Sequence, residues 1–119
     1  MKYMILIHSD MQFWQTLPEE EVNRVLGNHY TTINETKASG ELIRVEGLGN
    51  DRTFIEFRDG TPAVTDGPYS EVKEHLAGLF QVDVETIDRA IEVAGPLSEY
   101  GWVEIRPVME DVGDGDVTG

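Results

Sequence analysis

The 119-residue sequence predicts a single α+β domain with the split βαβ order of a ferredoxin-like fold. Its apolar patterning runs strand, helix, strands, strand, helix, strand, with a hairpin inserted before the second half. A tight-turn segment, Asp66-Gly67-Pro68-Tyr69, separates the two halves of this pattern. The order predicts an antiparallel sheet with two helices on one face.

The first half begins with a strand and a long helix. Residues Tyr3 to Ile7 are apolar at successive positions, which predicts a strand covered on both faces and central in its sheet. Thr16-Leu17-Pro18-Glu19 offers a capping hydroxyl, a proline in the first turn and an acid at capping-box spacing, and Gly40 is a suitable end. The apolar face of this helix is expected at Val22, Val25, Leu26, His29, Tyr30 and Ile33.

A meander of strands is expected next. Residues 41–46 and 52–58 have strand patterns, 59–62 is a tight turn by composition, and 63–64 is a short return strand. The apolar segment 75–84 is a further strand. Gly78 inside it indicates the close approach of another backbone or side chain.

The second half ends with a helix, a strand and a tail. Residues 85–94 predict a helix that Gly95-Pro96 ends, and residues 102–108 predict a strand on which Trp102 and Arg106 share a face. From Glu110 onward the chain is acidic and glycine-rich with almost nothing to bury. We therefore expect a domain over 1–109 and a disordered tail over 110–119.

Charge and composition limit the classes of partner. Nine Lys and Arg residues against 23 Asp and Glu residues give a net charge of −14, which repels phosphate groups, so we expect neither direct nucleic-acid nor membrane binding. The absence of cysteine excludes a disulfide framework and thiolate sites. The apolar run 1–7 is too short to span a bilayer and lacks a signal-like cleavage site, so we expect a cytoplasmic protein.

One face of the predicted sheet is left without a covering layer. An open face that carries Trp102 and the aromatic residues of the meander is too apolar to remain in water. We therefore expect a homodimer formed through the open sheet face, in a dimeric α/β-barrel-like assembly.

Few residues carry a recognisable chemistry. The sequence has no Gly-rich phosphate loop, nucleophile elbow or paired histidines of a zinc protease, and we expect no cofactor and no metal site. His29, on the inner helix face, can move protons if it lines a cleft, or else is a core histidine bonded to a carbonyl or carboxylate. His8 and His75 fit surface or packing roles better.

The partner carboxylate and the substrate contacts have several candidates. Asp66 either caps its own turn or orients and charges His29, and Asp10 after the first strand is the alternative. Lys73 either pairs with a neighbouring acid or holds an anionic substrate. Tyr30 and Trp102 are candidate walls of a substrate site.

Several segments together resemble a known family. They are Met1-Lys2-Tyr3-Met4-Ile5-Leu6-Ile7, the helix with His29, Val64-Thr65-Asp66-Gly67-Pro68-Tyr69, Lys73-Glu74-x-Leu76-x-Gly78 and Val103-Glu104-Ile105-Arg106-Pro107-Val108. From Met1 to Val108 the chain resembles the YCII-related family, and specifically its DGPF branch. Tyr69 stands where the branch usually has phenylalanine, and Ala77 where it usually has glycine.

The resemblance implies a ferredoxin-like domain, often dimeric. It also implies a histidine and an aspartate of acid/base catalysis, which fall on His29 and on Asp66 or Asp10. Tyr69 is a further candidate substrate contact. The wider family includes a dehydrochlorinase of a chlorinated aromatic, and muconolactone isomerase is related by fold. Some members of the branch are fused to sigma-factor domains.

Two functions from different classes follow. The first is a cofactor-independent isomerase or lyase, in which His29 moves a proton on a small cyclic or aromatic substrate and an aspartate tunes it. The second is a non-catalytic dimeric binding or regulatory module, linked to transcription through a sigma factor.

Overall fold

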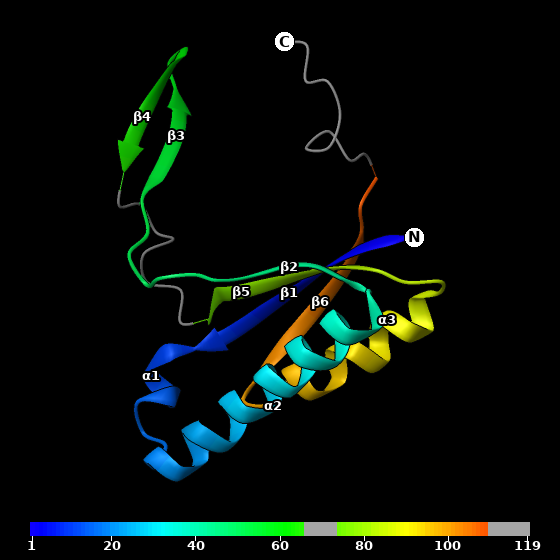
Figure 1. The fold of residues 1–119 in the computed structure, drawn as a ribbon. Coiled ribbons are helices and arrows are strands. Elements are labelled where there is room, and N and C mark those ends of the chain that lie inside the picture. Colours follow the sequence, from blue (N-terminus) through cyan, green and yellow to red (C-terminus); the bar gives the residue numbers. More distant parts are fainter. Residues whose placement is uncertain (66–73, 110–119) are drawn as a thin grey trace.

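A four-stranded antiparallel sheet forms the body of the protein in a computed structural model that describes residues 1–65 and 74–109 (Figure 1). Its strands are β1 (Lys2–Asp10), β2 (Leu42–Gly47), β5 (Glu74–Asp83) and β6 (Gly101–Pro107). They lie in the order β2-β5-β1-β6, and each neighbouring pair is antiparallel. The predicted α+β class and antiparallel sheet are confirmed, and the strand order is consistent with a ferredoxin-like fold.

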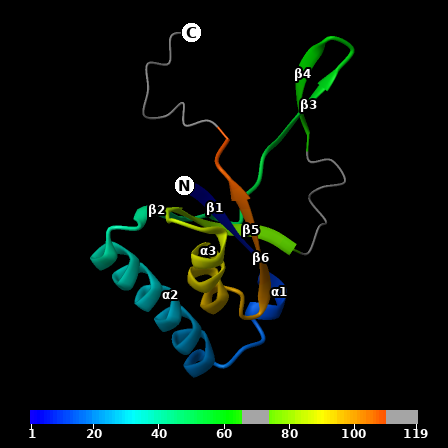
Figure 2. The same cartoon turned by 90° about the vertical axis from the view of Figure 1, so that its right-hand side faces the viewer.

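Two helices lie on one side of this sheet in both views (Figures 1 and 2). They are α2 (Glu19–Ser39) and α3 (Ile87–Ala94), and α3 continues into the 3₁₀ turn η2 (Gly95–Leu97). A short helix that the sequence pattern did not predict, α1 (Met11–Trp14), follows β1 directly. The expected placement of two helices on one face is confirmed.

The start of α2 differs from the expected capping box. Thr16 does not cap the helix, because its hydroxyl donates to the carbonyl oxygen of Phe13 at 2.6 Å. Pro18 is the residue that precedes the first turn, and Glu19, Glu20 and Glu21 place negative charge at the positive end of the helix dipole. The predicted end is confirmed, because Gly40 adopts a left-handed conformation with φ of 81°.

The core lies between the helices and the inner face of the sheet. Side chains of β1 alternate, with Tyr3, Ile5 and Ile7 buried and the residues between them only half-buried. The predicted central position of β1 is confirmed. Within the described residues the helices cover one face of β1 and the residues on its other face are half-buried, so the covering of that second face stays a prediction.

The buried face of α2 agrees with the expected one in part, since Val22, Val25, His29 and Ile33 are buried or half-buried. Val25, Thr32 and Thr36 are buried, whereas Leu26 is 41% and Tyr30 64% exposed. The threonines can be buried because their hydroxyls donate to helix carbonyls four residues earlier, at 3.0 and 2.7 Å. Two polar residues, Thr32 and Thr36, therefore lie on the buried face of α2, where hydrophobic spacing alone did not place them.

A two-stranded hairpin stands off the body on the side of the sheet away from the helices (Figures 1 and 2). It consists of β3 (Phe54–Arg58) and β4 (Thr61–Thr65). Asp59 and Gly60 join the strands with φ angles of 51° and 84°, which suits the tight turn of a right-twisted hairpin. The predicted strand and turn are confirmed, and the return strand is longer than expected.

Some of the predicted features lie in segments that the structure does not describe. The turn segment 66–69, Lys73 and the tail 110–119 lie outside the described residues, so the predictions made for them stay predictions. No helix within 1–65 and 74–109 is long and apolar enough to cross a membrane. The close approach predicted at Gly78 is confirmed, since a Cβ there would lie 3.0 Å from the carbonyl oxygen of Glu46.

Candidate functional site

A pocket of about 320 Å³ lies between the sheet and α2. It is lined mainly by apolar residues, and its polar lining residues are His8, Ser9, His29, Glu46 and Glu99. Its walls come from β1, α1, α2, β2, β5 and η2 and include Ile7, Met11, Trp14, Leu26, Ile33, Val45, Leu48, Phe80 and Leu97. Its size and lining are those of a site for a small, largely apolar ligand.

His29 contributes the most reactive group of this pocket. The side chain is half-buried, and its Nε2 is shielded from solvent without a hydrogen-bond partner among the described residues. A buried nitrogen of this kind is normally satisfied, so a ligand or water in the pocket is its natural partner. A satisfied core histidine would bond through Nε2 to a backbone carbonyl or a carboxylate. Nε2 of His29 makes no such bond among the described residues.

Burial also sets the charge state of His29. Desolvation lowers its pKa below the ordinary histidine value, and the negative charge of Glu99 offsets part of that effect. The imidazole is therefore mainly neutral near pH 7 and can accept a proton. A nearby carboxylate would stabilise the cation that forms when it does.

Glu99 is that carboxylate, and sequence reasoning missed it. Its Oε1 and Oε2 accept hydrogen bonds from Nη1 and Nη2 of Arg24 at 3.2 and 2.5 Å, and Oε1 accepts another from Nδ2 of Asn28 at 3.1 Å. The hydrogen bond from Arg24 lowers the pKa of Glu99, so this carboxylate remains ionised. Arg24 also binds Glu21, which in turn accepts a hydrogen bond from Tyr100.

Asp10 has a structural task of its own. Its Oδ1 accepts hydrogen bonds from the backbone N–H groups of Gln12 and Phe13 at 3.0 and 3.3 Å, and it thereby caps α1. It does not line the pocket. The short helix that it caps nevertheless supplies Trp14, whose indole Nε1 is buried without a partner among the described residues.

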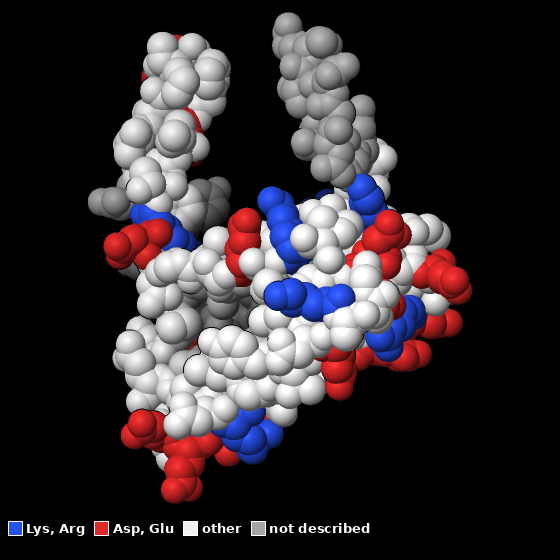
Figure 3. Space-filling view, viewed as in Figure 1, with Lys and Arg blue, Asp and Glu red and all other residues white. Residues whose placement is uncertain are grey.

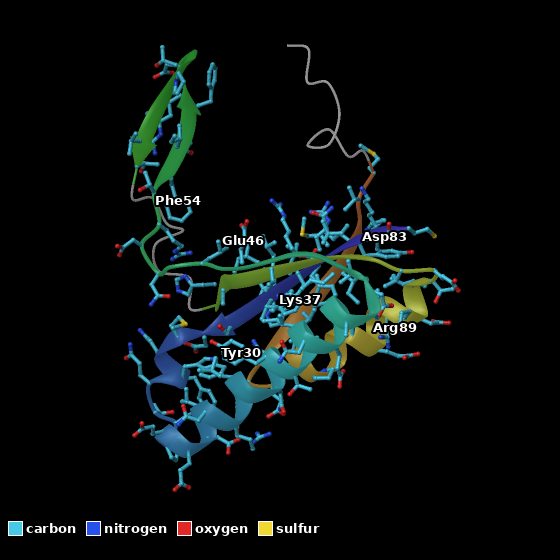
Figure 4. All side chains as sticks on the ribbon, viewed as in Figure 1. Tyr30, Lys37, Glu46, Phe54, Asp83 and Arg89 are labelled. Carbon is cyan, nitrogen blue, oxygen red and sulfur yellow. The ribbon has the colours of Figure 1, made fainter. Side chains whose placement is uncertain are left out.

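Tyr30 and Trp102, the two candidate walls, do not line this pocket. Tyr30 lies on α2 with 64% of its surface exposed (Figure 4). Trp102 stacks on His8 with ring centroids 3.9 Å apart and ring planes 9° apart, on the opposite face of the sheet. Asp66, Tyr69 and Lys73 lie outside the described residues.

His8 and His75 line a second, more polar hollow of about 480 Å³ with Asp51 and Arg52. The Nε2 of His8 lies 3.6 Å from Oε1 of Glu104. No group of three or more histidine, aspartate or glutamate side chains in the described ranges is arranged to hold a metal ion.

Comparison with known proteins gives a family and one relative. A model of the YCII-related domain matches residues 1–111. An uncharacterized protein of Rhizobium meliloti (strain 1021) is 29% identical over 114 residues, which cover 91% of this chain and 92% of the relative. The match therefore extends over nearly the whole of both chains.

Proposed function

The chain belongs to the YCII-related domain family, and on that basis we propose that it is a cofactor-independent isomerase or lyase. In this proposal His29 transfers a proton on a small cyclic or aromatic substrate held in the 320 Å³ pocket. The observation that carries the proposal is the buried Nε2 of His29, which has no partner among the described residues.

The pocket suits an apolar ring better than a charged metabolite. Its wall is mostly aliphatic and aromatic, and the ionised Glu99 beside it repels an anionic ligand. A ring that carries a carbonyl or hydroxyl group fits this lining, because the buried N–H of Trp14 can donate one hydrogen bond to such an oxygen.

Proton transfer can proceed in two balanced ways. In an isomerisation, neutral Nε2 takes a proton from one substrate carbon, the C–H electron pair enters the conjugated system, and the imidazolium returns the proton at a second carbon. In an elimination, the same electron pair expels the leaving group as an anion, and the imidazolium later gives its proton to water. In both, Glu99 stabilises the imidazolium through its charge.

The proposal also includes an aspartate that assists His29. Asp66 is the better candidate by its match to the branch motif, since the carboxylate of Asp10 is already engaged by two backbone N–H groups. Glu99 reduces the need for an aspartate, because it already supplies a negative charge to His29.

A solvent-exchange experiment tests this function. The protein is incubated in D₂O with cyclic ketones, unsaturated lactones and hydroxylated aromatics, and loss of substrate C–H signals is followed by NMR. We expect exchange with at least one class, and a loss of about 100-fold or more in His29→Gln, as is typical for removal of an acid/base group. His75→Gln is the matched control, because it removes a histidine that does not line this pocket.

The competing function is a non-catalytic binding or regulatory module, linked to transcription through a sigma factor. The exposed apolar hairpin, with Ile55 at 69% and Phe57 at 72% exposure, favours a role in protein contact. Wild-type exchange no faster than buffer, across all three compound classes, would favour the binding module. Equal exchange in wild type and His29→Gln would remove His29 from the mechanism.

A further inference from the structure

Two glycines on neighbouring strands form part of the pocket that His29 lines. The strand register pairs Gly47 of β2 with Gly78 of β5, and it pairs Gly78 with Ile7 of β1. Residues paired in this way share one face of the sheet, and Ile7 is buried on the inner face. Gly47 and Gly78, here called the glycine floor, both line the pocket and contribute only backbone to it.

The next row of the sheet shows what otherwise fills the space between the strands and the helices. Val45, Phe80 and Ile5 are aligned there, and Phe80 and Ile5 are 2% and 0% exposed. Protein interiors are close-packed, so side chains normally occupy such a layer. One row further, at the glycine floor, two adjacent positions have no side chain, and the pocket of about 320 Å³ lies beside them.

Gly78 has a structural reason to be glycine. The residue is buried, and a Cβ there would lie 3.0 Å from the backbone carbonyl oxygen of Glu46. A side chain at this position would therefore require β2 and β5 to shift apart. The sheet itself explains this half of the glycine floor.

Gly47 has no such reason. A Cβ at this position would have no heavy atom within 4 Å, and the residue is not one of the described glycines with a positive φ angle. Glycine weakens a strand, and it often marks a place where a ligand or another backbone comes close. No backbone comes close to the Cβ position of Gly47, whereas the residue does line the pocket. A ligand is the remaining explanation.

We propose that Gly47 determines the ring-size specificity of this pocket, and that its ligand is a planar compound of two fused rings with a hydroxyl or carbonyl group. The first ring lies over Gly78 on the same side of the sheet as His29, and the second ring lies over Gly47. This inference rests on the proposed function, because it specifies the shape of the cyclic or aromatic substrate named there.

Burial gives the direction in which the two rings lie. Gly78 is buried, whereas Gly47 is exposed and Leu48 is 41% exposed, so the glycine floor runs from the closed end of the pocket to its open end. Leu26 on α2, which is also 41% exposed, lines the same pocket. The surface between the base of the β3–β4 hairpin and α2 is largely white in Figure 3, with few charged side chains. An apolar second ring suits this end.

The floor also selects for a flat ligand. Backbone groups of paired strands form hydrogen bonds within the plane of the sheet, as when the N–H of Leu48 donates to the carbonyl oxygen of Ala77 at 2.8 Å. Without side chains, the glycine floor thus presents a flat surface to the pocket. Dispersion attraction weakens steeply as a gap opens, so a planar ring gains more contact here than a puckered one.

Phenol and 2-naphthol are the probes that test this inference. Each carries one hydroxyl group, and they differ by one fused ring. Dissociation constants are measured by NMR titration of the full-length protein. We expect wild type to bind 2-naphthol about tenfold or more tightly than phenol, because the second ring removes more apolar surface from water.

Variants of Gly47 should remove this preference. In Gly47→Val the added side chain occupies the place of the second ring, so the dissociation constant of 2-naphthol should rise about tenfold or more. That of phenol should change by less than about threefold, because its single ring lies over Gly78. Gly49→Val is the matched control and should change neither constant, since Gly49 also has open space around its Cβ position but does not line this pocket.

Gly47→Ala separates a role in binding from a role in folding. It should weaken 2-naphthol binding in the same direction as Gly47→Val but by less, and its urea midpoint should not fall below that of wild type, because its Cβ contacts nothing. A lower urea midpoint for Gly47→Ala would show that the sheet needs glycine here and would overturn the inference.

Three binding results would also overturn it. They are a wild type that binds 2-naphthol no more tightly than phenol, an unchanged constant for 2-naphthol in Gly47→Val, and an equal loss for both probes. Binding does not require proton transfer, so this inference and the proposed chemistry can fail separately. Ring-size selection without any C–H exchange would overturn the chemistry alone. Exchange that depends on His29, with no effect of Gly47→Val on binding, would overturn the role of Gly47 alone.

Discussion

Glu99 binds Arg24 through both carboxylate oxygens, at 3.2 and 2.5 Å, beside the pocket that His29 lines. The two residues are 75 positions apart in the sequence. The pair holds one ionised carboxylate close enough to His29 to raise its pKa against the effect of burial. The ion pair between Glu99 and Arg24 links the turn before β6 to α2, the helix that contains His29.

Replacing Glu99 should lower the pKa of His29 further. In Glu99→Gln the attraction between the carboxylate and the imidazolium is lost, while the desolvation of His29 remains. NMR titration of the histidine ring protons should show this downward change directly. Glu35→Gln, on the exposed side of α2, is the control. An unchanged or higher His29 pKa would contradict the assigned electrostatics.

The stability of the protein should fall as the solution becomes mildly acidic. The pKa of His29 is lower in the folded state than in the unfolded chain, so the unfolded chain binds the proton more readily. The stability that depends on neutral His29 is complete above about pH 6.5 and is lost below it. Urea unfolding at several pH values should show a smaller decrease for His29→Gln than for wild type. Equal decreases would contradict this linkage.

A second linkage belongs to Glu41, which ties the end of α2 to α3. Two hydrogen bonds from Arg89, at 2.9 and 2.8 Å, and one from Ser39 hold the pKa of Glu41 at about 2. Because this pKa is depressed, the stabilisation is present above the ordinary pKa of 4.5 and is lost as the pH falls toward about 2.

The size of the Glu41 contribution is limited by solvent, since the side chain of Arg89 is 40% exposed. We expect Glu41→Gln to lower the free energy of unfolding by about 1 kcal/mol at pH 7 and to have little effect near pH 2. Glu56→Gln, in the β3–β4 hairpin, is the control for loss of an exposed carboxylate. If Glu41→Gln lowers the free energy of unfolding as much near pH 2 as at pH 7, the ion pair is not the cause of the effect.

Gly101 should be intolerant of any side chain. A Cβ at this position would lie 2.1 Å from the carbonyl oxygen of His8 on the paired strand, so β1 and β6 would have to separate. We expect Gly101→Ala to destabilise the protein by roughly 2 kcal/mol or more, by urea unfolding. Gly27→Ala, inside α2 with open space around it, should instead stabilise by about 0.5–1 kcal/mol. Similar effects at both positions would contradict the close approach of β1 and β6 at Gly101.

The sequence pattern was sufficient for the four strands of the sheet and for α2 and α3, because each of these elements has its own local signal, whereas it did not predict α1. Alternating or continuous apolar residues mark the strands, and Gly40 marks the end of α2. The face of α2 was harder to predict, because Thr32 and Thr36 satisfy their hydroxyls within the helix and can be buried. A prediction from hydrophobic spacing alone does not place threonine residues on a buried helix face.

The candidate site was predictable only in part. His29 stands out as an ionisable residue at an inner helix position, and the structure places it at a pocket. Glu99 gave no local signal, because tertiary folding brings it to Arg24 and Asn28 from distant positions. Asp10 resembled a catalytic carboxylate, whereas a short helix immediately after β1 uses it as a cap.

The pH dependence of substrate C–H exchange tests the central proposal most directly. If neutral His29 is the base, the exchange rate rises with pH through an apparent pKa below the ordinary histidine value. That pKa should equal the one from the NMR titration of His29 and should move downward with it in Glu99→Gln. A rate that is independent of pH across this range, or a kinetic pKa that stays fixed when the pKa of His29 moves, would contradict the proposal.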